Sequence, residues 1–414
     1  MVNKLIFILF LFTIFNSVLM AQFNLSKEQI EEDFNFLWEN INEHYAYFDK
    51  KQTGWNMVKE IYHLQIKDID SKEKLLRFFE TILEELYDNH TTLNTNNLHS
   101  PRLVPSGLSI WAEWLNGKAI ITDIRSELIS KVNFTPGSEI ISINDVPIED
   151  AVNSHIGKSI RTIDNDVRNW ALRRVIAGTY DEKRIIKILS DNKEYNLDLD
   201  ILDKDINERV SNDLLTSTIL ENNIGYIRIN NSLGNESLIG RFDSTLLFLR
   251  TTSALILDLR NTPGGGNSLV ARAIMGRFIF KEMPYQKHSF TESDYKIKRS
   301  FIEYVSPREG YIYDKPVAIL VNHWTGSMGE GMTIGFDAMN RAKITGTKMA
   351  GLCGAIENIT LPNSKIVVNF PTEKLFHVNS TPREEYVPSI SIDINNFNED
   401  IILQKAISII KNEE

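Results

Sequence analysis

Three short apolar runs in the second half of the chain constrain the fold more than any other feature. They read "IGYIRI" (224–229), "ALILDLR" (254–260) and "VAILVN" (317–322). Helical spacing appears between and after them, near 237–250, 268–278 and 329–340, and "KITGT" (343–347) follows. Apolar strands separated by helices are typical of a largely parallel sheet, whose ligands bind at the carboxyl ends of the strands. The sequence therefore predicts an α/β domain over 206–414.

The first residues have the pattern of a secretory signal. Lys4 supplies a positive charge, an apolar run follows over 5–15, and Ala21 is a small residue at a cleavage position. The apolar run is short for a membrane span, so we expect a signal peptide over 1–21 and a secreted or periplasmic protein. An uncleaved anchor, which would tie the protein to a membrane, is the alternative.

Residues 22–98 have a helical pattern. "SKEQ" (26–29) fits a helix capping box, and Ile30, Phe34, Leu37 and Ile41 recur at helical spacing. A second amphipathic run covers 75–87. We expect a small helical bundle that ends in "YDNHTTLN" (87–94).

Residues 99–205 consist of short alternating strands, interrupted by a helical stretch near 167–177. Within them, "PGSEIISINDVPIEDAV" (136–152) combines a Pro-Gly turn, a strand, an Asn-Asp turn and another short strand. This segment resembles a PDZ domain, a module that binds an extended peptide as an added strand. An unspecified small β-domain is the alternative.

Composition excludes several classes of function. The net charge of −10 and the lack of a basic patch argue against a nucleic-acid partner. The single cysteine, Cys353, excludes an internal disulfide, and nothing in the spacing indicates a zinc site. We expect no metal and no organic cofactor.

A glycine-rich segment follows the second apolar run. In "DLRNTPGGG" (258–266), three successive glycines let the backbone approach a ligand and point N–H groups at an anion. The pattern of a nucleotide-binding loop, G-x-x-x-x-G-K-[ST], is absent. A flexible turn is the alternative.

Ser327 lies in "NHWTGSMGEG" (322–331), between a strand and a helix. With Glu330 it forms an S-x-x-E capping box, a common structural device. A serine here would also sit at the positive end of a helix dipole, with the Met328 N–H ready to stabilise an oxyanion. Thr325 replaces the first glycine of the G-x-S-x-G elbow, which argues against an α/β-hydrolase.

A serine nucleophile needs a base, and His90 is the best placed of the eight histidines. It falls in a polar turn just after a long helix, next to Asn89. His323 precedes Ser327 by four residues, but the strand end should aim it elsewhere.

Taken together, these segments resemble one family of peptidases. "IGYIRI", "LILDLRNTPGGG" and "VAILVNHWTGSMGEG" follow the PDZ-like segment in the order found in serine peptidases of the C-terminal-processing (tail-specific) and tricorn-core type. That group also includes the retinoid-binding protein repeats. "FDKKQTGW … LYDNHTTL" looks like the N-terminal bundle of the tricorn-like branch. The resemblance covers nearly the whole chain after the signal, and it implies a ClpP/crotonase-like mixed sheet with helices.

The resemblance also implies roles for particular residues. Ser327 matches the nucleophile, and the oxyanion hole would use the N–H of Gly264 or Gly265 together with that of Met328. The C-terminal-processing enzymes use a lysine base, but Leu352 stands at the matching position and Lys348 is out of register. His90 would therefore be the base, as in the tricorn-like branch.

That branch also orients its histidine with a late glutamate, acting through a serine. Glu384 or Glu385 matches this glutamate, with Glu384 slightly preferred. Asn89 stands where the bridging serine would be, and its amide can both donate and accept.

These observations predict a secreted or periplasmic serine endopeptidase that cleaves unstructured or C-terminal peptide segments through an acyl-enzyme. Peptides or unfolded proteins would be its partners, and a homo-oligomer is left open. The alternative is a non-catalytic protein on the same fold that binds peptides or lipophilic ligands.

Overall fold

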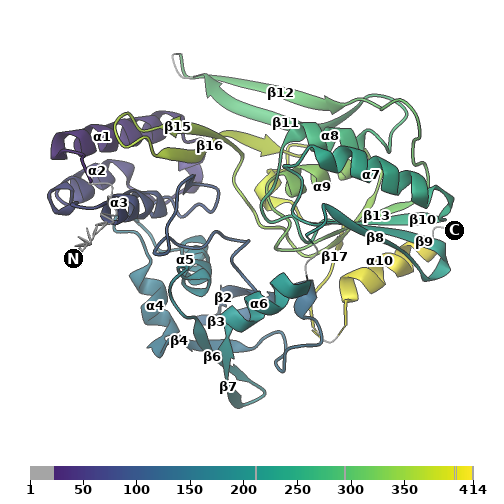
Figure 1. The fold of residues 1–414 in the computed structure, drawn as a ribbon, viewed down its shortest axis with the longest axis horizontal. Helices are drawn as coiled ribbons and strands as arrows, with labels where there is room; N and C mark the ends of the chain where they lie inside the picture. The colour runs from purple at the N-terminus through teal and green to yellow at the C-terminus, as the bar shows by residue number, and fades with distance from the viewer. Residues whose placement is uncertain (1–22, 210–211, 293–294, 396, 398, 413–414) are drawn as a thin grey trace, which may run out of the picture.

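The computed structural model describes residues 23–209, 212–292, 295–395, 397 and 399–412 (Figure 1). The signal peptide expected over 1–21 lies outside these residues. Three β-sheets and their covering helices make up the described chain. In the part of the chain that the structure describes, no helix is both long and apolar enough to cross a membrane.

The largest unit is a mixed six-stranded sheet in the order β17-β14-β13-β10-β9-β8. All neighbours are parallel except β8, which runs antiparallel to β9 at one edge. Its strands are β8 (Leu215–Leu220), β9 (Ile224–Ile229), β10 (Ala254–Asp258), β13 (Val317–Val321), β14 (Lys343–Gly346) and β17 (Ile390–Ser391).

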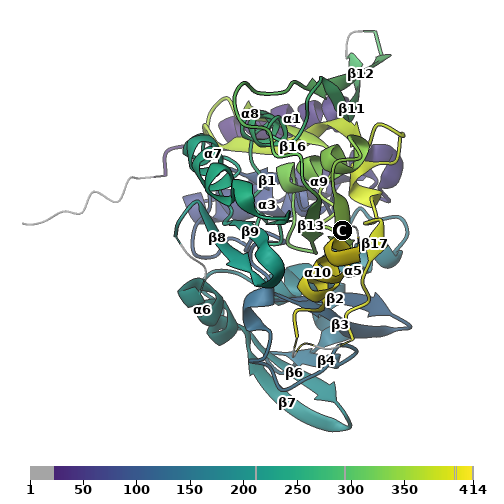
Figure 2. The ribbon, with the colours of Figure 1, turned by 90° about the vertical axis from the view of Figure 1, so that its right-hand side faces the viewer.

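Helices cover both faces of this sheet (Figures 1 and 2). Leu255 and Leu257 of β10 face the core under three helices, whereas Ala254 and Ile256 face a fourth. Strands buried on both faces explain why the central strands are apolar throughout. The first group is α7 (Ser237–Phe248), α8 (Ser268–Met275) and α9 (Met328–Ala338), and the fourth helix is α10 (Ile401–Asn412).

The N-terminal helices are α1 (Lys27–His44), α2 (Trp55–His63) and α3 (Lys72–Glu84). The Ser26 capping box is present, since Ser26 and Gln29 each accept the other's backbone N–H through their side chains. The core of these helices is completed by Val368 and Phe370 from a much later hairpin. That hairpin consists of β15 (Ala355–Thr360) and β16 (Val367–Phe376).

The hairpin belongs to a second sheet, which joins a short strand after the N-terminal helices to strands from the second half of the chain. In the order β1-β16-β11-β12, it pairs β1 (Thr92–Leu93) with β16, and then adds β11 (Met283–Glu292) and β12 (Ile297–Val305). Asp33 of α1 accepts the Asn363 and Ser364 N–H groups in the hairpin turn. The helical segment is therefore packed against the C-terminal half of the chain.

The third sheet is antiparallel, with the path β2-β3-β4-β6-β7 and β5 beside β4. Its core also contains Trp324, three residues before Ser327, and the Trp324 indole N–H donates to the Leu108 carbonyl at 2.7 Å. The elements are β2 (Ile110–Leu115), β3 (Lys118–Ile124), β4 (Glu139–Ile143), β5 (Val146–Pro147), α4 (Ile148–Ser154), α5 (Asn165–Ala177), β6 (Ile185–Ser190), β7 (Lys193–Asp198) and α6 (Leu199–Arg209).

The predicted fold class is confirmed: helices, then an antiparallel β-domain, then a mixed parallel α/β domain with helices on both faces. The expected strands and helices of the α/β domain lie where their patterns placed them. The β11–β12 and β15–β16 hairpins, the edge strand β8 and helix α10 were not predicted.

Candidate active site

Ser327 stands at the turn between β13 and α9 with an unusual backbone. Its φ of 51° and ψ of −110° lie outside the regions that a side chain with a Cβ normally adopts. Such a conformation costs on the order of 1–3 kcal/mol and persists where the surroundings enforce it, commonly at functional sites. The residue is half-buried, although its neighbours in the turn are buried.

The glycine-rich loop after β10 lies directly against Ser327. Thr262 of the loop bridges Thr325 in parallel pairing, and the Gly326 N–H donates to the Thr262 carbonyl at 3.2 Å. A Cβ on Gly265 would lie 2.4 Å from the Ser327 Cβ and 2.8 Å from its Oγ. Gly265 also has φ of +65°. Only glycine satisfies both conditions at that position.

The backbone donors near Ser327 differ in what they already bind. The Gly264 N–H donates to the Asn231 side-chain oxygen at 2.8 Å. The Gly265 N–H makes a long 3.3 Å bond within its own turn, to Thr262. The Met328 N–H has no hydrogen-bond partner among the described residues. Of the two glycines expected in an oxyanion hole, Gly265 is the one that touches Ser327.

Glu330 organises the start of α9 from inside the protein. Its side chain is fully buried and accepts three backbone N–H groups, from Ser327 at 2.7 Å, Gly351 at 2.9 Å and Leu352 at 3.3 Å. Burial raises the pKa of Glu330 to about 7, against the opposing effect of the Arg383 charge and these hydrogen bonds. The predicted cap is thus also an anchor for the loop at 351–352.

His90 is held by the next residue of that same loop. Its Nδ1 hydrogen-bonds the Cys353 carbonyl oxygen, and its backbone N–H donates to Asp88 at 2.9 Å. Because a carbonyl only accepts, Nδ1 carries the proton and Nε2 of the neutral ring has a free lone pair. Burial, followed by the nearby Arg383 charge, lowers the pKa of His90 below its ordinary value.

The loop at 351–354 therefore connects the two predicted catalytic residues. Glu330 binds both the Ser327 N–H and the Leu352 N–H, and the Cys353 carbonyl binds His90. No hydrogen bond joins the His90 ring to Ser327 within the described residues.

The predicted relay from a late glutamate to His90 is not formed in the structure. Glu384 bonds Lys50 at 2.7 Å and the Tyr47 hydroxyl at 3.5 Å, and Glu385 bonds Lys50 at 2.5 Å. Neither makes a hydrogen bond to His90 or Asn89 among the described residues. The Lys50 ammonium group instead forms ion pairs with both glutamate carboxylates. The Cys353 carbonyl is the hydrogen-bond partner of the His90 Nδ1.

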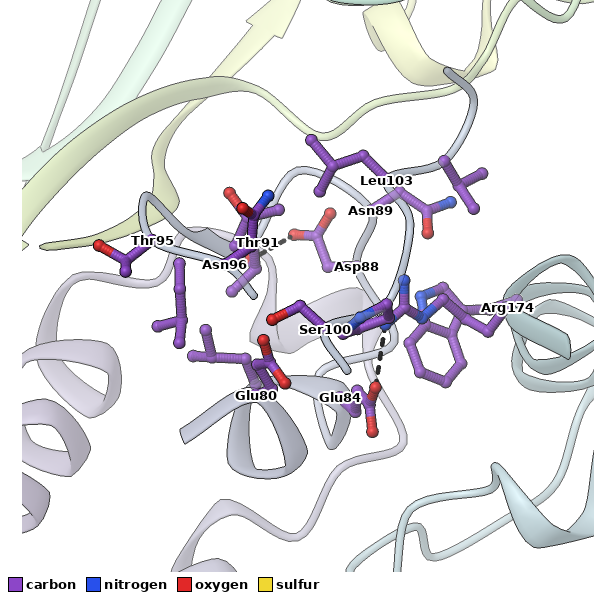
Figure 3. A pocket seen from close by; sticks show the side chains of 16 residues that line it. Glu80, Glu84, Asp88, Asn89, Thr91, Thr95, Asn96, Ser100, Leu103 and Arg174 are labelled. Atoms are coloured by element: carbon purple, nitrogen blue, oxygen red, sulfur yellow. Dashed lines mark hydrogen bonds and ion pairs between the residues drawn. The ribbon is translucent and has the colours of Figure 1, made fainter. Parts of the chain in front are cut away.

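Asn89 faces a different space. It lines a small cavity of about 80 Å³ beside the His90 turn, together with Asp88 and Thr91 (Figure 3). Within it the Thr91 hydroxyl donates to Asp88 at 3.2 Å, and Arg174 pairs with Glu84 at 2.9 Å. Asp88 also accepts the Tyr45 hydroxyl at 2.8 Å, so it braces the turn that carries His90.

The position expected for a lysine base is apolar. Leu352 is buried, and its Cδ1 would lie 3.2 Å from a Cβ on Gly326. Lys348 is exposed. His323 stacks on Trp111, and burial lowers the pKa of His323 to about 3. No group of three or more His, Cys, Asp or Glu side chains that could hold a metal ion occurs in the described ranges.

Sequence reasoning missed several residues that shape the site. The Asn231 side chain caps the Gly264 N–H, Arg383 donates to the Leu352 and Gly354 carbonyls, and Lys50 holds the late glutamates. Lys50 lies in the segment "FDKKQTGW" and Arg383 directly precedes Glu384, so their charges were visible in the sequence. Their partners were not, because these partners are backbone carbonyls and residues far away in the sequence.

Solved structures of proteases share this fold. Mature CPAF is 15% identical over 94% of this chain and 98% of its own, with a TM-score of 0.64. A putative peptidase from Parabacteroides merdae is 16% identical over 92% and 96%, with a TM-score of 0.56. The photosystem II D1 C-terminal processing protease is 15% identical over 89% and 94%, with a TM-score of 0.52. At these identities the likeness shows the fold alone.

Family models identify the class of protein. Residues 223–395, which contain the glycine-rich loop, Ser327 and the late glutamates, match the model of a peptidase family, and the chain is a serine-type peptidase. The matching model is that of peptidase family S41. Residues 26–84, the helical segment before His90, match the tricorn protease C1 domain.

Proposed function

We propose that this peptidase cleaves peptide bonds with Ser327 as nucleophile and His90 as general base. The observation that carries the proposal is the single loop at 351–353, which is tied to Ser327 through Glu330 and to His90 through Cys353. Both catalytic groups are therefore fixed relative to one backbone segment. Such preorganisation is what a nucleophile and its base require.

In the first step, the free Nε2 of His90 takes the proton from the Ser327 hydroxyl as Oγ attacks the peptide carbonyl carbon. His90 then donates this proton to the leaving amine, and the peptide's acyl part stays on Ser327 as an ester. Water hydrolyses the ester with His90 acting again as base and then as acid. The lowered pKa of His90 keeps the ring neutral and competent at neutral pH.

The negative oxygen of each tetrahedral intermediate would be stabilised by the Met328 N–H, which has no partner in the described chain, and by the Gly265 N–H. The Gly265 N–H makes only a long hydrogen bond to the Thr262 carbonyl, which it can exchange for a bond to the oxyanion. The start of α9 adds the positive end of its dipole. Gly264 supports the loop instead, through its bond to Asn231.

A peptide would reach Ser327 through a cleft of about 960 Å³ beside the glycine-rich loop. Asn231, Asn261 and Pro263 line it from the α/β side, and residues such as Tyr180 and Asp203 line it from the β-domain. A cleft this size holds an extended segment of several residues, which fits unstructured or C-terminal peptides. We further propose that the PDZ-like domain holds such a segment and that the protein acts outside the cytoplasm after removal of residues 1–21.

Labelling with a fluorophosphonate tests the assignment. The reagent should form an adduct on Ser327, which peptide mapping by mass spectrometry would locate. Ser327→Ala should abolish both labelling and cleavage of an unfolded protein substrate. His90→Gln should slow both by on the order of 100-fold or more, the usual contribution of a general base.

His155→Gln is the matched control, because His155 follows the last residue of α4 and its side-chain hydrogen bonds in the described chain go to Ala151 and Ser154 of that helix. This variant should label and cleave like the wild type. If the folded wild-type protein is not labelled at Ser327, the chain is a binding protein on a peptidase fold. If it is labelled equally in His90→Gln, the base is another group.

A further inference from the structure

The outer strand of the second sheet, β12, has one unpaired edge. It pairs with β11 on one side and is the last strand of the sheet order, so no described strand covers its other side. Figures 1 and 2 both show the β11–β12 hairpin at the outer rim of the molecule. A strand of nine residues thus presents a free row of backbone N–H and C=O groups.

Large apolar side chains are concentrated on this edge strand. Ile297, Phe301, Ile302 and Tyr304 are between 40% and 55% exposed, and they lie on both faces of the strand. Proteins normally protect an edge with short strands, prolines, inward charges or bulges. β12 contains no proline, and its pairing with β11 is regular from Gln286↔Glu303 to the hairpin end. An edge of this kind can pair with a strand of another chain.

We propose that β12 binds β12 of a second copy of this chain, antiparallel across a two-fold axis at Phe301. In this register Phe301 faces Phe301 of the other copy, and Arg299 faces Glu303. Lys298 lies opposite Tyr304, where an ammonium can rest on the ring. Opposite charges and apolar pairs directly across a ladder stabilise it, and this register has no like-charge pair.

Other two-fold registers are worse. An axis at Arg299 or at Glu303 would set two like charges face to face. An axis at Ser300 places Ile297 against Glu303, and an axis at Ile302 places Phe301 against Glu303. The order of residues in β12 therefore selects the axis at Phe301.

The charges on β12 fit the same partner. The Arg299 side chain is 63% exposed, and its only ion pair in the described chain is a 3.6 Å contact with the exposed Glu292. Glu303 is partly buried in a network with His288 and Arg272, so it is held in place. Arg299 of the second copy would reach a fixed carboxylate, and the two five-stranded sheets would become one continuous sheet.

Sedimentation velocity of the full mature chain tests the proposal over a range of micromolar concentrations. The wild type should sediment as a dimer. Arg299→Glu should shift the protein to monomer, because the new carboxylate would face the Glu303 carboxylate of the other copy. Lys298→Glu is the matched control, since residue 298 faces an uncharged ring and should weaken the dimer much less.

Cross-linking tests the register directly. Directly opposed residues in an antiparallel pair have Cβ atoms about 4.5–5.5 Å apart, so Phe301→Cys should form a disulfide between copies on mild oxidation. Phe248→Cys, at a 70% exposed site on α7, is the control and should cross-link no faster than random collision allows.

Two outcomes would overturn the proposal. One is a wild-type monomer at every concentration together with equal cross-linking of the two cysteine variants. The other is unchanged sedimentation of Arg299→Glu with weaker cleavage of a protein substrate, which would show that the edge binds substrate. Fluorophosphonate labelling of each variant reports whether its α/β domain is folded.

Discussion

At the scale of single residues, Gly265 lies directly against Ser327. The absence of a Cβ at Gly265 allows the loop to touch Ser327 and to keep a positive φ. Both the close contact with Ser327 and the orientation of the Gly265 N–H therefore depend on the missing Cβ of Gly265.

Gly265→Ala should therefore abolish cleavage without unfolding the protein. The added Cβ would overlap the Ser327 side chain, and loss of an oxyanion donor alone slows such reactions by about 10²–10³. Gly117→Ala is the matched control: Gly117 also has positive φ, but its Cβ would meet nothing within 4 Å. Each variant should lose about 1–2 kcal/mol of unfolding free energy from the backbone, and only Gly265→Ala should lose activity.

The environment of His90 predicts the pH dependence of cleavage. Burial and Arg383 lower the pKa of His90, whereas Asp88 and the Cys353 carbonyl raise it. The lowering dominates, so the neutral base persists to a pH below the ordinary imidazole value of 6.5. The part of the pH profile that reports His90 should fall as pH drops through that lowered pKa.

Arg383→Gln should move the acid limb of kcat/KM to higher pH. Removing the positive charge makes protonation of both His90 and Glu330 easier, so both pKa values rise. Arg383→Lys keeps a charge but loses the paired guanidinium donors, and its acid limb should stay near that of the wild type. An acid limb that is unmoved in Arg383→Gln would contradict the electrostatic role of Arg383.

At the scale of secondary-structure elements, the start of α9 determines the geometry of the site. The Glu330 carboxylate accepts the N–H of Ser327 and the N–H groups of Gly351 and Leu352, so the helix cap and the loop next to His90 form one structure. A cap of this kind positions catalytic groups as well as ending a helix.

Glu330→Gln tests this coupling. The glutamine amide offers one accepting oxygen instead of two, so at least one buried N–H loses its partner, at a cost of about 1–3 kcal/mol in unfolding free energy. Because the wild-type carboxyl must be ionised to accept from both oxygens, cleavage should also decline below about pH 7 as Glu330 protonates.

The Glu330→Gln variant should lack the decline of cleavage below about pH 7, and its kcat should be lower than that of the wild type at every pH. Glu357→Gln, on the exposed face of β15, is the control and should leave both unchanged. Retention of the pH 7 component in Glu330→Gln would assign it to another group.

The elements that the sequence predicted are those whose pattern is local. The β9, β10 and β13 runs and helix α9 carry their own apolar spacing, so they could be placed without knowing their neighbours. The β11–β12 and β15–β16 hairpins could not, because their strands are partly exposed and lack a short Asn-Gly or Asp-Gly turn. The burial of β15–β16 depends on helices more than 200 residues earlier in the chain.

The residues of the candidate site also divide into those with a local sequence motif and those that depend on distant parts of the chain. Ser327, the glycine loop and His90 were predicted because motifs carry them. The Cys353 carbonyl that anchors His90 could not be predicted, since a backbone oxygen has no sequence signature and lies 263 residues from its partner. Glu384 was assigned to this role by resemblance, and the structure gives its carboxylate to Lys50 instead.

At the scale of the whole molecule, the β-domain and the α/β domain pack against each other close to Ser327. Arg173 lies over the Trp111 ring at 4.5 Å, and His323 stacks on that ring with centroids 4.5 Å apart. Trp324 enters the β-domain core from the same turn. The strained backbone of Ser327 is thus held from both domains.

Trp111→Ala should lower both stability and reactivity. Loss of a buried indole costs about 3–5 kcal/mol, and the turn before Ser327 loses its stacking partner, so fluorophosphonate labelling should slow. Trp114→Ala is the control: Trp114 is buried in the same strand but packs near Arg168, and its loss should destabilise without slowing labelling of the folded protein. Equal slowing in both variants would assign the effect to general instability.

The pairing of β1 with β16 has a consequence for protein synthesis. His90 lies two residues before Thr92, whose ladder partner is Asn369. In a growing chain the Ser327 turn is made before β16, the strand that pairs with β1 next to His90. If Ser327 and His90 act as proposed, a chain that ends before β16 lacks the partner strand of β1, and we expect it to be inactive as a protease.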